Sequence, residues 1–157
     1  METDAFGNEF RIKKAAEYRT KFEPLFRYIQ YFAQKEGATV RSIYDGDGSP
    51  DNSVPVPVFD STVLAFVKEA QKTGMMDRNY IYTYSRLRMK TAADERMTIA
   101  KTTLRDIDNI TAIMSKYVLG GMVRGVLWNE AVREGIWLHC LLKVRELVTQ
   151  FDGPMGL

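Results

Sequence analysis

Hydrophobic positions recur at helical spacing in most of the chain, and most clearly in its last third. Between 106 and 118 they fall three or four residues apart, and Gly120 and Gly121 follow directly. A second such run, at 126–134, ends at Gly135, and a third follows it. Residues three and four apart share one face of an α-helix, and glycine commonly ends a helix. The last third therefore predicts three helices with their apolar stripes in the core. The predicted stripes comprise Ile107, Ile110, Ile113, Met114, Tyr117, Val118, Leu127, Trp128, Ala131, Val132, Trp137, Cys140, Leu141, Val144, Leu147 and Val148.

The first third predicts a helix at 9–19 and another that ends before Gly37. Thr20 and Glu23 have the spacing of a capping box, and Pro24 then stands where the first turn of a helix tolerates proline. Two separate helices and one helix that kinks at Pro24 both fit this pattern.

The middle of the chain predicts three more helical segments. One runs from the N-cap candidate Asp60 to Gly74, with an apolar face of Val63, Phe66, Val67 and Ala70. Residues 79–89 fit a strand of alternating tyrosines or a helix, and we favour the helix. Residues 92–103 have a weaker apolar face and are also predicted to be helical.

Two short segments have the pattern of strands. Residues 38–44 alternate apolar and polar positions, and 54–58 form an extended run whose prolines restrict it to a sheet edge. Between them, 45–53 is rich in residues that favour turns. The expected fold class is therefore α+β, predominantly α-helical: a helical core with a small two-stranded β element.

Composition limits the architecture further. The chain has 157 residues, 45% hydrophobic and 27% charged, with a net charge of +2. This length and composition predict a single globular domain over 1–157, with 1–8 and 152–157 flexible. No apolar run is long enough for a membrane span, and the first residues have no secretory pattern. One cysteine cannot form an internal disulfide, so we expect a cytoplasmic protein.

The best candidates for a binding site are Arg124 and Trp128. They stand four residues apart and share a face of any helix that begins near Arg124. Such a pair can form a cation–π contact or line a pocket with a polar lip. A purely structural contact between the two side chains is the competing interpretation.

A second candidate is a basic, tyrosine-containing region at 78–105. It holds seven basic residues against two acidic ones, and the basic segment 11–27 would extend it. Cations that neutralise phosphates, beside rings that stack on bases, are typical of single-stranded nucleic-acid binding. The candidate residues are Tyr80, Tyr84, Arg86 and Arg88. The competing interpretation is that the tyrosines face the core and the cations face solvent, and the low net charge favours it.

The sequence shows no pattern for a metal or a cofactor. The acidic loop at 45–53 resembles a calcium loop, but Pro50 replaces its diagnostic glycine and Val56 its bidentate glutamate. An exposed turn therefore explains the loop better. His139 and Cys140 are neighbours on a helix and point about 100° apart, which disfavours a catalytic dyad.

The last third resembles an uncharacterised bacterial domain-of-unknown-function family. The residues that carry the resemblance are Tyr117, Val118, Gly125, Trp128, Gly135, Leu141 and Leu142, within a region of similar element order at about 25–150. The resemblance implies an Arg/Glu-rich aromatic cluster before the glycine, and this chain departs from it with Gly120, Gly121, Met122 and Val123. The resemblance implies a bacterial origin, and it implies no activity.

These patterns together favour a non-catalytic binding or protein-interaction module of a bacterial cytosolic protein. The apolar last helix would suit a homodimer contact if Trp137 were only partly covered. The alternative is a nucleic-acid-binding accessory protein that uses 78–105. A third class, an enzyme, would need carboxylates such as Asp106, Asp108 and Glu130 gathered in one pocket.

Overall fold

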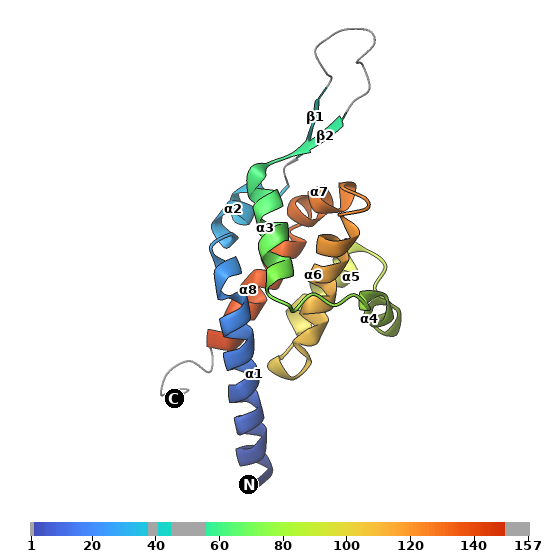
Figure 1. Cartoon of the computed structure of the whole chain (residues 1–157). Helices are drawn as coiled ribbons and strands as arrows, with labels where there is room; N and C mark the ends of the chain where they lie inside the picture. Colours follow the sequence, from blue (N-terminus) through green and yellow to red (C-terminus); the bar gives the residue numbers. More distant parts are fainter. Residues whose placement is uncertain (1, 38–40, 45–55, 150–157) are drawn as a thin grey trace, which may run out of the picture.

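The computed structural model describes the backbone at 2–37, 41–44 and 56–149, and side chains at 9–37 and 60–149. Within these residues the chain forms eight α-helices, joined by short connections (Figure 1). They are α1 (Glu2–Phe26), α2 (Ile29–Lys35), α3 (Ser61–Lys72), α4 (Tyr80–Leu87), α5 (Ala92–Lys101), α6 (Asp108–Gly120), α7 (Val126–Arg133) and α8 (Ile136–Thr149). A one-turn 3-10 helix, Leu104–Asp106, precedes α6.

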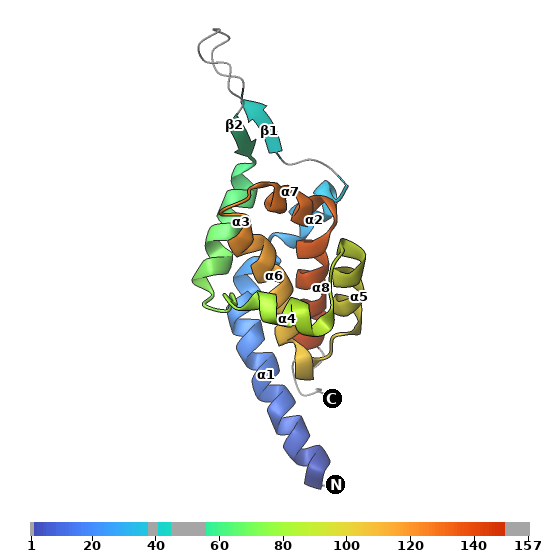
Figure 2. The ribbon, with the colours of Figure 1, turned by 90° about the vertical axis from the view of Figure 1, so that its right-hand side faces the viewer.

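The expected α+β class is wrong, because the body of the fold is all-helical. Its core consists of helices that bury their apolar faces against one another. Strands β1 (Arg41–Tyr44) and β2 (Val56–Phe59) pair as a two-stranded antiparallel ribbon. The ribbon projects from one end of the helical body (Figures 1 and 2). A ribbon of this size presents no face broad enough to form a layer. The local strand signal therefore does not determine the class. The acidic turn at 45–53 and the end at 152–157 lie outside the described residues.

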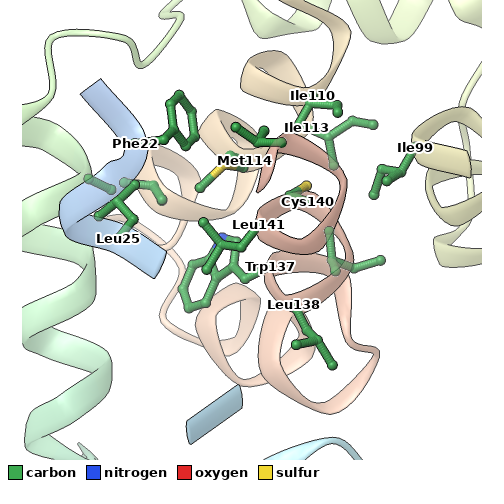
Figure 3. Packing of buried hydrophobic residues seen from close by; sticks show 14 of the residues in the cluster. Phe22, Leu25, Ile99, Ile110, Ile113, Met114, Trp137, Leu138, Cys140 and Leu141 are labelled. Carbon is green, nitrogen blue, oxygen red and sulfur yellow. The ribbon is translucent and has the colours of Figure 1, made fainter. Parts of the chain in front are cut away.

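Helix α8 is the centre of the fold. It packs against α1, α2, α5, α6 and α7. Its predicted stripe is buried, and Figure 3 shows Trp137, Cys140 and Leu141 facing side chains of the neighbouring helices. Ile136 and Leu138, outside that stripe, are buried as well, because helices surround α8 on several sides.

The predicted homodimer contact required part of the Trp137 stripe to be exposed. The Trp137 side chain is fully buried within one chain. Its ring centroid lies 4.8 Å from that of Phe66 and 5.6 Å from that of Phe32. The stripe is therefore covered by the chain's own helices.

Helix α1 begins at Glu2, before the predicted start, and runs through Thr20 and Glu23 without a cap. Pro24 lies inside its last turn. Proline has no N–H to donate and its ring crowds the preceding turn, so a helix that contains it bends or stops. The chain accordingly leaves the helix after Phe26, and α2 begins at Ile29. The predicted capping box at Thr20 is therefore wrong: the chain does have two helices, but the break follows the proline.

The remaining helices are present where the sequence predicts them, but the weak apolar face of 92–103 is wrong, because Met97 is 59% exposed and only Ile99 of that face is buried. Residues 79–89 contain α4, so the helical alternative is correct. The buried residues of α3 are the predicted Val63, Phe66, Val67 and Ala70. Every predicted stripe residue of α6 is buried, whereas Leu127 and Trp128 of α7 are only half-buried. Leu127 of this half-buried face lines an open groove.

Candidate functional site

An open groove of about 940 Å³ lies between α4 and the turn that joins α6 to α7. In Figure 2, α4 crosses in front of α6. Contacts between α4 and α6 hold the two helices together, and α7 continues the wall beyond the turn. The volume lies within the range of about 300–1,000 Å³ that is usual for ligand sites. The groove is therefore large enough for a small molecule or one face of a helix.

The edge of this groove has three exposed apolar side chains. Ile81 of α4 is 68% exposed, and Met122 and Val123 of the turn are 58% and 88% exposed. All three line the groove, together with the less exposed Leu119 and Leu127. Single exposed apolar residues are common, and here three of them share one groove.

Three cations line the same groove, two of them exposed. Arg78 precedes α4 and Arg124 lies in the α6–α7 turn, and no ion pair within the described residues involves either. Lys116 is the third cation, and Glu130 of α7 is the one carboxylate in the lining. Cations thus outnumber carboxylates, which gives the groove a positive character beside its apolar edge.

Beneath Lys116 lies a buried carboxylate, Glu95 of α5, which is 1% exposed. The hydroxyls of Tyr84 and Tyr117 each donate to one of its oxygens, at 2.6 Å. The Lys116 Nζ donates to Glu95 Oε2 at 3.2 Å, and lies 5.0 and 4.9 Å from the two tyrosine ring centroids. A buried charge is tolerated when it is paired and hydrogen-bonded, and Glu95 has one ion pair and three donors.

This cluster links three helices and positions two residues of the groove. Burial, followed by the nearby Glu95 carboxylate, raises the pKa of both Tyr84 and Tyr117. Both tyrosines therefore stay neutral donors across the physiological range. Because Lys116 lies over both rings and donates to Glu95, the cluster acts as a rigid floor for the groove.

Sequence reasoning missed Glu95, although one signal was present. Glu95 stands four residues before Ile99, so the two share the inner face of α5. A charged residue in that position is normally assigned to solvent. Its acceptance in the core depends on partners from α4 and α6, which local pattern does not identify.

Of the two predicted binding residues, the described structure places only Arg124 in the lining of the groove. Trp128 lies behind it, half-buried, and its indole Nε1 donates to the Val118 carbonyl at 3.3 Å. A Cβ at Gly121 would lie 2.1 Å from the Trp128 ring, so only glycine allows this close packing. Helix α7 begins at Val126, so Arg124 precedes the helix that carries Trp128 and the predicted shared helix face is absent. Arg124 lines the groove, and Trp128 supports its wall.

Of the four nucleic-acid candidates, only the two tyrosines line the groove. Tyr80 and Tyr84 line the groove, but the Tyr84 ring is covered by Lys116 and its hydroxyl is engaged by Glu95. Arg86 donates to Asn109 Oδ1 at 3.0 Å, and Arg88 ends α4 with φ +56°. Stacking on bases needs open aromatic faces. Among the tyrosines of 78–105, Tyr82 is 63% exposed, whereas Tyr84 has its ring covered.

The remaining candidates have structural partners. The His139 Nδ1 donates to the Gly135 carbonyl at 2.6 Å. Cys140 is fully buried, and burial raises the pKa of its thiol. Asp106 accepts from the Thr103 N–H at 2.7 Å, and Asp108 accepts from a tyrosine hydroxyl on α1. These groups therefore act within the fold rather than at the groove.

Comparison with known proteins adds no assignment. No family model, curated protein or solved structure matches the chain. The resemblance of 105–150 to a bacterial family therefore stays a prediction. Among the helices that the structure describes, none has the length and apolar character needed to cross a membrane. Within the same part of the chain, no three His, Cys, Asp or Glu side chains are grouped as metal ligands.

Proposed function

We propose that this protein is a non-catalytic protein-interaction module that binds an acidic, amphipathic helix of a partner protein. The binding surface is the groove between α4 and the α6–α7 turn. The observation that carries the proposal is the group of exposed apolar residues, Ile81, Met122 and Val123, beside the cations Arg78 and Arg124. A bacterial, cytosolic setting is part of the proposal, and it rests on the sequence alone.

The apolar edge of the groove matches the way proteins bind helices. An amphipathic helix places apolar residues at every third or fourth position into such a groove. Fully burying one large apolar side chain is worth about 1.5–3 kcal/mol. Two or three anchors against Ile81, Met122 and Val123 would therefore supply the main driving force.

The cations beside the groove determine which partner helices can bind. Arg78 and Arg124 have no ion-pair partner among the described residues, and they flank the apolar edge. Carboxylates on the rim of a bound helix would pair with them, which favours correct orientation and speeds association. A basic helix would meet like charge and would be disfavoured. The partner is therefore acidic beside its apolar stripe.

A displayed library of helix-forming peptides of about 18 residues, roughly five turns, tests the proposal. Selection on the wild-type chain should enrich peptides that combine an apolar stripe with flanking Asp or Glu. The enriched peptides are then titrated by fluorescence anisotropy. Met122→Glu should weaken their binding at least about tenfold, because it places a carboxylate where an apolar anchor docks.

Met97 provides a matched control, because it is 59% exposed on α5 and does not line the groove. Met97→Glu should leave the affinity unchanged. Peptides that bind Met122→Glu as tightly as wild type would contradict the proposal. Salt-sensitive binding of single-stranded RNA or DNA, without peptide binding, would support the nucleic-acid alternative instead.

A further inference from the structure

A second groove, of about 490 Å³, lies among α1, α8 and the connection from α5 to the 3-10 helix. Its charged lining consists of Arg11, Lys101, Arg105, Lys143 and Glu146. The four cations come from three segments that are far apart in sequence. In Figure 2, α8 lies next to α5, and both α1 and α5 pack against α8. Only the folded chain brings these cations together.

This groove concentrates charge that the chain as a whole does not have. Its lining has a surplus of three positive charges, whereas the entire chain carries only +2. No ion pair among the described residues involves Arg11, Lys101 or Arg105. Glu146 is paired with Lys143 at 3.6 Å, and the nearby Asp106 is engaged by Thr103. Like charges gathered in a cleft repel one another and attract anions.

The floor of the groove is fixed. Lys143 is only 18% exposed, and its Nζ donates to the Ala100 carbonyl at 3.1 Å. The buried Leu104 and Leu147 form an apolar wall beside it. A held ammonium in a walled groove loses less conformational freedom on binding than a free surface lysine. This arrangement differs from a scatter of solvated cations.

We propose that this groove binds clustered phosphate groups. The guanidinium groups of Arg11 and Arg105 suit bidentate contacts to phosphate oxygens, and Lys101 and Lys143 add point charges. The same chemistry occurs in a free polyphosphate ester and in the backbone of a nucleic-acid strand. The site is separate from the α4 groove, so it does not depend on the proposed function.

Two probes distinguish a free polyphosphate ligand from the backbone of a nucleic-acid strand. Isothermal titration calorimetry measures binding of inorganic tripolyphosphate, and fluorescence anisotropy measures binding of a labelled single-stranded oligonucleotide. Lys101→Gln and Arg105→Gln should each weaken binding at least about tenfold, because each removes a charge-assisted contact. Both side chains are exposed, so circular dichroism should show an unchanged fold.

Lys90→Gln is the matched control, since Lys90 is exposed and does not line either groove. Tripolyphosphate binding that is lost only in the groove variants supports a free phosphate ligand. Oligonucleotide binding with the same variant dependence, without tripolyphosphate binding, supports a strand backbone. The proposal is overturned if neither probe binds, or if Lys90→Gln weakens binding as much as Lys101→Gln. Peptide binding at the α4 groove should be unaffected by Lys101→Gln, which keeps the two proposals distinguishable.

Discussion

Replacing Glu95 by alanine tests whether the buried cluster holds α4, α5 and α6 together. The substitution removes the acceptor of two tyrosine hydroxyls and one ammonium at once. Tyr117 is almost fully buried, so its hydroxyl would have no water to replace the carboxylate. Lys116 is partly exposed and can turn toward solvent. The loss of folding stability therefore comes mainly from tyrosine hydroxyls that are left without an acceptor.

The magnitude follows from these environments. Removing one partner of a buried ionic group typically costs about 3–5 kcal/mol. Because Lys116 can recover solvation, we expect the lower end, about 3 kcal/mol. Domains of this kind are stable by only about 5–15 kcal/mol, so Glu95→Ala would remove a large share of the total.

Urea unfolding followed by circular dichroism measures the effect. With an m value of about 2 kcal/mol/M, a loss of about 3 kcal/mol lowers the midpoint by about 1.5 M. Glu134→Ala is the control, because Glu134 is a partly exposed carboxylate paired with Arg96 at 3.2 Å. Exposed pairs contribute about 0–1 kcal/mol, so its midpoint should hardly change. A Glu95→Ala midpoint no lower than that of Glu134→Ala would refute the structural role of the cluster.

Three further predictions concern other parts of the fold. The folded-state pKa of Tyr84 and of Tyr117 is raised above the unfolded value of 10.0, so the stability each phenol contributes is constant below that pH and falls above it by about 1.4 kcal/mol per pH unit. The contribution of these phenols to the urea midpoint should therefore be unchanged between about pH 8 and about pH 9.5 and should fall by about pH 11, less steeply in Tyr117→Phe; a fall as steep in Tyr117→Phe would contradict this assignment. Gly121→Ala should cost about 1–3 kcal/mol in thermal unfolding, because its Cβ would lie 2.1 Å from the Trp128 ring; an unchanged melting temperature would contradict that packing. Thr91→Ala removes the cap of α5 and should cost about 1 kcal/mol, with faster hydrogen exchange in the first turn of that helix; unaltered exchange there would argue against the cap.

The long helices were predictable because their information is local. The stripes of α6 and α8 repeat over three or more turns, and the structure buries them. The fold class could not be predicted from local pattern alone. The segments at 38–44 and 54–58 carry a strand pattern, but whether a ribbon joins the core depends on what packs against it.

The groove depends on information that is not local. Arg124 was identified from its spacing, yet its neighbours Arg78 and Ile81 reach the same groove only because α4 packs on α6. Glu95 shows the same limit more strongly. Its side chain is accepted in the core only through Tyr84, Tyr117 and Lys116, which come from two other helices.

The central position of α8 has a consequence for synthesis of the chain. Helices α1, α2, α5, α6 and α7 all precede α8 in sequence, and all pack against it. Until the ribosome releases 136–149, their apolar faces have no common partner, so the nascent chain exposes surface that a chaperone would bind. A stop codon before Ile136 would therefore yield an aggregation-prone chain rather than a smaller working domain.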